Sequence, residues 1–268
     1  MAELAEKRLF LLDMDGTLYL DDDLFPGTIP FLRRIREKGG RYLFLTNNSS
    51  RGADSYVEKL RRLGIESVPE DFLTSVDALI LFLRKGDYQG KPLYVAGTES
   101  FRRQLRSAGF SVTSDREEAE VLICGFDTEL TFQKLEDACI LLGQGVPYLA
   151  TNPDWVCPTW YGYVPDCGSV CEMLWRATGR RPLVVGKPQP EMVLLAMERT
   201  GFSPAETLVV GDRLYTDIAC GVNAGVDTAL VLSGESTRET LAASDVQPTW
   251  VLRDVAELLE QMQREEQV

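Results

Sequence analysis

The stretch Leu9-Phe10-Leu11-Leu12-Asp13-Met14-Asp15-Gly16-Thr17 decides the fold. Its four leading apolar residues predict a buried strand, and two aspartates follow that strand closely. Tyr42–Leu45 is a second apolar run, which ends in Thr46, and a helical pattern over residues 26–38 separates the two runs. A second amphipathic helix is expected at residues 53–63. Continuous apolar strands that alternate with helices predict a parallel sheet covered on both faces.

A similar pattern returns in the C-terminal part of the chain. Pro182–Val185 leads to Lys187, Thr207–Val210 leads to Asp212, and a further strand is expected at Thr228–Leu232. Helices are predicted at residues 191–200, 217–224 and 255–266; the middle of the chain has predicted strands at 93–96, 121–124 and 147–150 and helices at 101–108 and 135–142.

These elements predict an α/β protein with two domains. The chain has 268 residues, which is more than a single hydrophobic core usually organises. The simplest arrangement is a Rossmann-like parallel-sheet core interrupted by an inserted α/β cap domain. The core is expected over residues 1–80 and 183–268, and the cap over residues 81–182.

The composition excludes several classes of function. The formal net charge of −13 argues against nucleic acid or an anionic membrane as a partner. The chain has no histidine, which removes Ser-His-Asp catalysis and histidine-based zinc sites. No Cys-x-x-Cys pair occurs among its six cysteines, so reduced packing thiols are expected. The polar N-terminus and the lack of a membrane-length apolar run predict a cytoplasmic protein.

Four predicted core strands end in polar residues that together suit phosphoryl chemistry: Asp13, Thr46, Lys187 and Asp212. Ligands of open parallel sheets bind at the carboxyl ends of the strands, where these residues should meet. Two carboxylates suit Mg²⁺, and a lysine and a hydroxyl can donate to phosphoryl oxygens. A carboxylate can also attack phosphorus, and Asp15 is expected on the same side of the chain as Asp13.

The segment Asp13-Met14-Asp15-Gly16-Thr17-Leu18 resembles motif I of the haloacid dehalogenase superfamily. Thr46, Lys187 and Gly211–Asp217 are similar to its motifs II, III and IV, in the same order. Thr46-Asn47-Asn48, Ala150–Asp154 and Gly186-Lys187-Pro188 resemble the NagD / p-nitrophenyl-phosphatase branch. The resemblance covers nearly the whole chain.

This resemblance implies a Mg²⁺-dependent phosphomonoesterase for small phosphorylated metabolites, such as sugar phosphates, nucleoside monophosphates or p-nitrophenyl phosphate. Asp13 would form an aspartyl-phosphate, and Asp15 would protonate the leaving oxygen and then activate water. Thr46 and Asn47 would hold the phosphoryl group, and Lys187 would stabilise it and orient Asp13. The implied metal site comprises Asp13, the backbone carbonyl of Asp15, Asp212 and Asp217.

The cap is expected to choose the substrate. Lys187 follows Thr46 by 187 − 46 = 141 residues, which places the cap between motifs II and III. Asn152 and Asp154 are candidate substrate-binding residues in a loop region that also carries Trp155, Trp160, Tyr161 and Tyr163. Local turn chemistry and packing are the alternative for this region. Cys167 and Cys171 have the i, i+4 spacing of packed helix residues.

Other interpretations remain open at this point. An EF-hand starting at Asp13 would need Gly at its sixth position and Glu at its twelfth, where Leu18 and Leu24 stand. Asp21–Asp23 is expected to be a solvated turn. A phosphotransferase or mutase of the same superfamily would usually carry a smaller cap between motifs I and II. A non-catalytic phosphometabolite-binding protein is the third alternative, and a homodimer through the cap is compatible with the resemblance.

Overall fold

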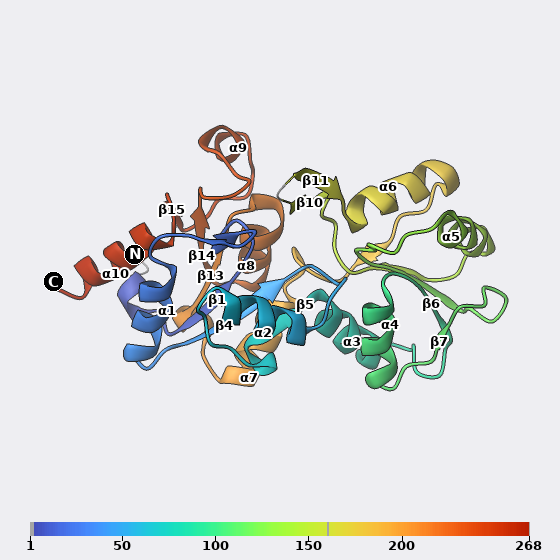
Figure 1. The fold of residues 1–268 in the computed structure, drawn as a ribbon, viewed down its shortest axis with the longest axis horizontal. Coiled ribbons are helices and arrows are strands. Elements are labelled where there is room, and N and C mark those ends of the chain that lie inside the picture. The colour runs from blue at the N-terminus through green and yellow to red at the C-terminus, as the bar shows by residue number, and fades with distance from the viewer. Residues whose placement is uncertain (1–2, 160, 268) are drawn as a thin grey trace. The chain divides into compact units, whose positions relative to one another are not determined.

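The computed structural model describes residues 3–159 and 161–267, which divide into two compact units (Figure 1). The first unit holds the chain up to Thr46, Val57–Leu73 and the chain from Lys187 onward. The second unit holds Asn47–Tyr56 and Thr74–Gly186. An α/β fold is therefore confirmed, with two predicted site residues, Thr46 and Lys187, at points where the chain passes between units.

The first unit, the core, is built on a six-stranded sheet in the order β15-β14-β13-β1-β4-β5. The central strand β1 is parallel to both neighbours, and Leu12 lies opposite Val210 on one side and Phe44 on the other. Residues Leu9–Leu12 are almost completely buried because helices cover both faces of the sheet. The strands are β1 (Leu9–Leu12), β4 (Arg41–Thr46), β5 (Phe72–Thr74), β13 (Thr207–Gly211), β14 (Asp227–Val231) and β15 (Trp250–Leu252).

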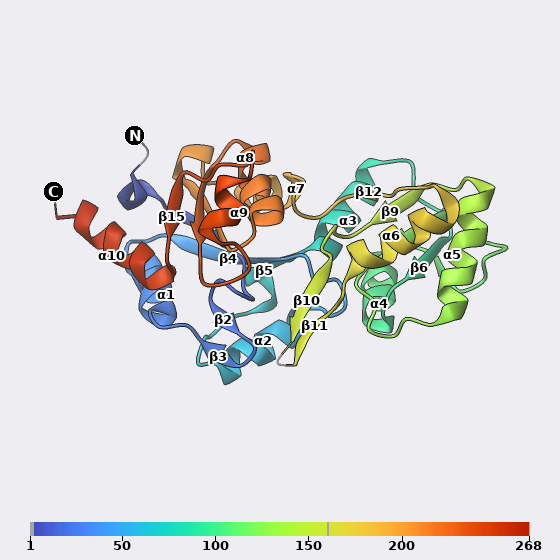
Figure 2. The same cartoon turned by 90° about the horizontal axis from the view of Figure 1, so that it is seen from above.

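The core helices pack in pairs. Helix α1 (Thr28–Glu37) contacts α10 (Val255–Glu265) on one face of the sheet, and α7 (Glu191–Thr200) contacts α8 (Ala219–Ala224) on the other (Figure 2). Each buries its apolar stripe against the strands, as Phe31, Leu32 and Ile35 of α1 do. Shorter pieces are the 3₁₀ turns Leu4–Glu6, Pro69–Asp71 and Pro204–Glu206, the hairpin β2 (Tyr19–Leu20) and β3 (Asp23–Leu24), and α9 (Arg238–Ala242).

The second unit, the cap, has a five-stranded sheet in the order β12-β9-β8-β6-β7. Side chains along its strands alternate between two apolar clusters, as the two-residue period of a strand requires. Leu93 and Val95 pack in one cluster with α3 and α4, whereas Tyr94 and Ala96 pack in the other with α5 and α6. Figure 1 shows where these helices and β6 lie. The elements are α3 (Ser75–Lys85), β6 (Leu93–Ala96), α4 (Glu99–Ser107), β7 (Val112–Thr113), β8 (Val121–Cys124), α5 (Phe132–Gln144), β9 (Tyr148–Ala150), α6 (Cys167–Thr178) and β12 (Leu183–Val184).

One predicted core strand is in the cap. Pro182–Val185 was expected to join the core sheet, but β12 pairs in parallel with β9, with Leu183 opposite Leu149. Val185 packs in an apolar cap cluster, so burial on the cap side decides where this short segment lies. Residues 74–80 also differ from the predicted division, because Val76 and Leu79 of α3 pack in the same cluster.

The polar-aromatic loop region of the cap contains a hairpin that the sequence did not suggest. Strands β10 (Val156–Thr159) and β11 (Gly162–Pro165) pair antiparallel. Tyr161 and Tyr163 are 64% and 68% exposed, and Trp155 just before the hairpin is 51% exposed. Trp160 lies outside the described residues. Within the described ranges, no helix combines the length and the apolar character needed to cross a bilayer.

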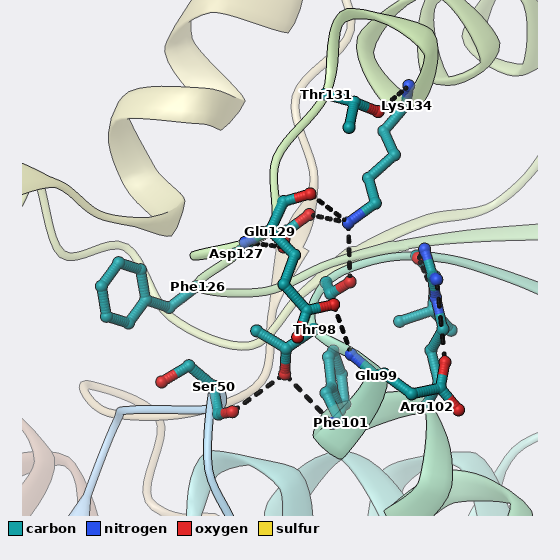
Figure 3. Close-up of polar contacts among 12 residues, drawn as sticks. Ser50, Thr98, Glu99, Phe101, Arg102, Phe126, Asp127, Glu129, Thr131 and Lys134 are labelled. Atoms are coloured by element: carbon teal, nitrogen blue, oxygen red, sulfur yellow. Dashed lines mark hydrogen bonds and ion pairs between the residues drawn. The ribbon is translucent and has the colours of Figure 1, made fainter.

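A buried ion pair joins two loops of the cap (Figure 3). The Nζ atom of Lys134 donates to Asp127 Oδ2 at 2.7 Å, to the carbonyl of Glu129 at 2.9 Å and to the carbonyl of Gly97 at 3.1 Å. The Asp127 side chain is only 2% exposed. Lys134 therefore ties the loop after β8 to the loop after β6.

Replacing Lys134 by methionine is expected to lower the free energy of unfolding by about 3–5 kcal/mol, because it leaves the Asp127 carboxylate buried without its cation. Urea denaturation at neutral pH measures this change. The matched control is Lys91→Met, which removes an exposed ion pair with Asp87 and should cost less than about 1 kcal/mol. Equal losses in the two variants would contradict a special role for the buried pair.

Candidate active site

Three carboxylates from two distant parts of the sequence meet at the carboxyl edge of the core sheet. Asp13 directly follows β1, and Asp212 directly follows its neighbour β13. Asp217 lies in the π-helical turn η4 (Leu214–Ile218) that comes next. One carboxylate oxygen of each residue lies within 4.8 Å of the others, and no other such group of three acidic or cysteine ligands occurs in the described part of the chain.

Lys187 joins this carboxylate cluster. Its Nζ atom donates to Asp13 Oδ1 at 2.7 Å, to Asp217 Oδ1 at 2.6 Å and to the carbonyl of Leu45 at 3.1 Å. The residue is 2% exposed. Although it follows a cap strand and not the predicted core strand, Lys187 reaches the same edge of the core sheet. The predicted meeting of Asp13, Lys187 and Asp212 is therefore observed.

The loop after β14 and the turn after β1 fix the Asp212 side chain. The backbone N–H of Glu235 donates to Asp212 Oδ2 at 2.7 Å. A Cβ atom on Gly234 would lie 2.0 Å from that oxygen, and one on Gly16 would lie 2.7 Å from it. Gly16 also has a φ of +89°, which favours glycine. Neither position therefore accommodates a side chain without moving Asp212.

The cluster carries an excess of buried negative charge. Burial raises the pKa of Asp212 to about 7, and Asp217 adds to this shift. Burial and Asp217 also raise the pKa of Asp13, while Lys187 opposes the change. Burial lowers the pKa of Lys187, but Asp13 and Asp217 together outweigh that effect and raise it. Lys187 is therefore a cation here, and ionisation of all three carboxylates would leave the four groups with a net charge of 1 − 3 = −2.

The donor set fits a magnesium ion. Mg²⁺ prefers hard oxygen ligands and is usually held by one or two carboxylates together with water and phosphate oxygens. Asp13, Asp212 and Asp217 supply such oxygens from rigid elements, and a divalent cation would balance the two uncompensated charges. A loop glycine, Gly234, lets the backbone approach the Asp212 carboxylate and fix its orientation.

Asp15 does not belong to the carboxylate cluster through its side chain. Its Oδ1 atom accepts from Lys59 Nζ at 3.3 Å, and the side chain is 41% exposed. Its backbone forms a bridge with Tyr19, and Gly16 N–H donates to the Tyr19 carbonyl at 2.8 Å. The turn after β1 thus separates Asp15, which faces solvent, from Asp13, which faces Lys187.

Two predicted residues of the cap, Asn152 and Asp154, take part in a buried network with Asn47. Asp154 Oδ2 accepts from the side-chain amides of Asn47 and Asn152, both at 2.8 Å, and the Asn152 amide also donates to Asp166 at 3.0 Å. Asn152 and Asp154 are 1% and 2% exposed. The network gives them a role in holding the Asn47 amide, while direct contact with substrate stays a prediction.

Some residues of the site were missed by sequence reasoning. Lys59 was assigned only to an amphipathic helix, and the Glu235 N–H that holds Asp212 was not considered. The sequence did contain a signal for Glu235. This residue follows Gly234 and the strand predicted at 228–232, so it could have been expected at the same edge of the sheet. Strand β4 ends at Thr46, and this residue is buried. Thr46 is the residue predicted to supply the phosphate-binding hydroxyl.

Comparison with known proteins identifies the family. Residues 10–111 match the family model of haloacid dehalogenase-like hydrolases, and residues 184–258 match a second model described as HAD-hydrolase-like. An acid sugar phosphatase of Staphylococcus aureus is 31% identical over 261 residues, which cover 97% of this chain and all of that protein. The chain belongs to the haloacid dehalogenase superfamily.

Solved structures place the chain within that superfamily. A 4-nitrophenylphosphatase from Thermotoga maritima is 40% identical, with a TM-score of 0.89 over 96% of this chain and 98% of that one. A glycerol phosphate phosphatase from Mycobacterium tuberculosis, solved in complex with magnesium, is 30% identical, with a TM-score of 0.89 over 96% and 79% of the two chains. The predicted p-nitrophenyl-phosphatase-like branch is confirmed, and the chain is a hydrolase of this phosphatase family.

Proposed function

We propose that this protein is a Mg²⁺-dependent phosphomonoesterase that hydrolyses small phosphorylated metabolites through an aspartyl-phosphate on Asp13. The observation that carries the proposal is the Lys187 ammonium between Asp13 and Asp217, with Asp212 beside them. The relatives named as sugar, glycerol and nitrophenyl phosphate phosphatases support sugar phosphates and related small esters as the substrate class.

The first half of the reaction transfers the phosphoryl group to Asp13. One Asp13 oxygen attacks phosphorus while the bond from phosphorus to the ester oxygen breaks. Asp15 gives a proton to the departing oxygen, which leaves as an alcohol. The other Asp13 oxygen stays with Lys187, so the attacking carboxylate keeps its orientation. Thr46 and Asn47 are proposed to donate to the phosphoryl oxygens.

The second half of the reaction returns Asp13 to its free form. Asp15, now a carboxylate, takes a proton from a water molecule that attacks phosphorus. The bond between phosphorus and Asp13 breaks, and inorganic phosphate leaves. Asp13, Asp212, Asp217 and the backbone carbonyl of Asp15 would hold Mg²⁺, which would supply charge neutralisation for the phosphoryl oxygens when bound.

A beryllium fluoride complex, which mimics a phosphoryl group, is expected to bind to Asp13 in the presence of Mg²⁺. It should inhibit hydrolysis of p-nitrophenyl phosphate and appear in a crystal structure bonded to an Asp13 carboxylate oxygen. Attachment at a serine or cysteine, or hydrolysis that continues in excess EDTA, would contradict the proposed mechanism. A panel of phosphate esters, compared by kcat/KM, then identifies the preferred leaving group.

A further inference from the structure

Helix α2 (Ala53–Arg62) carries Lys59, whose side chain contacts the turn after β1. Lys59 has no role in the proposed reaction so far. We infer that Lys59, held on the ring of Tyr19, is a positioning residue that orients the Asp15 carboxylate for proton transfer. This inference rests on the proposed function, in which Asp15 serves as acid and base.

Lys59 contacts both ends of one short turn. Its Nζ atom lies 3.3 Å from Asp15 Oδ1 and 4.0 Å from the centroid of the Tyr19 ring. Tyr19 is completely buried, and the Lys59 side chain is 19% exposed. The Lys59 side chain is thus largely covered, and its ammonium group lies against a ring that is fixed by burial.

The backbone locks the two partners of Lys59 together. Asp15 and Tyr19 form a β-bridge, Gly16 N–H donates to the Tyr19 carbonyl at 2.8 Å, and Leu18 N–H donates to the Met14 carbonyl at 2.9 Å. The distance between the aspartate backbone and the aromatic ring is therefore fixed. A cation seated on the ring meets Asp15 in one orientation and leaves its other oxygen, Oδ2, for the transferred proton.

The contact between Lys59 and Asp15 is better explained by a need to orient the Asp15 carboxylate than by a contribution to folding stability. The Asp15 side chain is 41% exposed, and ion pairs of such exposure contribute little to folding. An exposed aspartate without a partner would rotate among its rotamers, and general acid–base catalysis depends on the position of the proton donor. A misplacement of about 1 Å in a catalytic geometry can lower a rate about 100-fold.

Substrates with different leaving groups can distinguish a role of Lys59 in proton transfer from a structural role. Departure of p-nitrophenolate needs little help from a proton donor, whereas departure of an alkoxide from glycerol phosphate or a sugar phosphate needs it. The ratio kcat/KM reports only on steps up to the first irreversible one, so it excludes hydrolysis of the aspartyl-phosphate. Both esters should be assayed at saturating Mg²⁺ with the wild-type protein, Lys59→Met and Arg62→Met. Arg62→Met is the matched control, because Arg62 is an exposed residue of the same helix and its replacement removes the same charge.

We expect Lys59→Met to lower kcat/KM for the alkyl ester about 10- to 100-fold and to change kcat/KM for p-nitrophenyl phosphate less than about 3-fold. Arg62→Met should change neither by more than about 2-fold. Equal losses on both esters, an unchanged alkyl ester, or the same pattern in Arg62→Met would overturn the role of Lys59 while leaving the phosphatase proposal in place. Failure of the wild-type protein to hydrolyse either ester would overturn both.

Discussion

Changing Asp13 to asparagine is expected to lower kcat on any phosphate ester by at least about 10⁴-fold, because the variant has no carboxylate to form the proposed aspartyl-phosphate. The amide oxygen of asparagine can still accept from Lys187, whose Nζ lies 2.7 Å from Asp13 Oδ1. Burial raises the pKa of Asp13, so a neutral side chain at this position should not destabilise the fold. Steady-state hydrolysis and urea denaturation measure the two effects separately.

The matched control for this variant is Asp22→Asn, which makes the same chemical change at an exposed position in the acidic turn nearby. Its kcat should stay within about 2-fold of wild type, since a solvated aspartate contributes little. Residual activity above about 1% in Asp13→Asn would argue that another group attacks phosphorus. Loss of activity together with loss of folding cooperativity would show instead that Asp13 is needed for structure.

The sheet edge was predictable because its signal is local. Asp13 and Asp212 each directly follow a continuous apolar strand, and the structure confirms that β1 and β13 are parallel neighbours. The prediction that Lys187 lies at this edge was correct, but it assumed that the preceding strand belongs to the core sheet. That strand, β12, pairs with β9 in the cap. A two-residue strand of Leu and Val carries no information about which sheet it joins, and only tertiary packing decides this.

Contacts between side chains of separate helices and strands could not be predicted from the sequence. Lys59 looks like any charged residue of an amphipathic helix, and its approach to Tyr19 depends on how α2 crosses the turn after β1. Asn152 and Asp154 are predicted to bind substrate because the resembling branch selects the leaving group with this part of the cap, and the sequence does not show that both side chains are buried. The hairpin at β10 and β11 was missed because Pro158 and the lack of alternation hide its strands.

Changing Asp212 to asparagine is expected to weaken Mg²⁺ binding on the order of 100-fold and to lower activity at limiting Mg²⁺ in proportion. Asp212 supplies one of the three carboxylates, and the Glu235 N–H holds it 2.7 Å away. Its folded-state pKa is raised to about 7, so without a bound cation the fold loses stability as the pH rises from the ordinary aspartate pKa toward 7 and does not regain it above that pH. The neutral asparagine removes this cost, and the metal-free variant should therefore be at least as stable as the metal-free wild type.

Two measurements test this prediction without relying on turnover. Calorimetric titration gives the Mg²⁺ dissociation constant directly, and thermal unfolding with and without Mg²⁺ gives the stabilisation by the ion. Wild type should gain about 2.7 kcal/mol at a Mg²⁺ concentration 100 times its dissociation constant, and Asp212→Asn should gain well under 1 kcal/mol at the same concentration. Asp245→Asn, an exposed aspartate of the same unit, should behave as wild type. Unchanged Mg²⁺ affinity in Asp212→Asn would show that the ion does not bind at the carboxylate cluster.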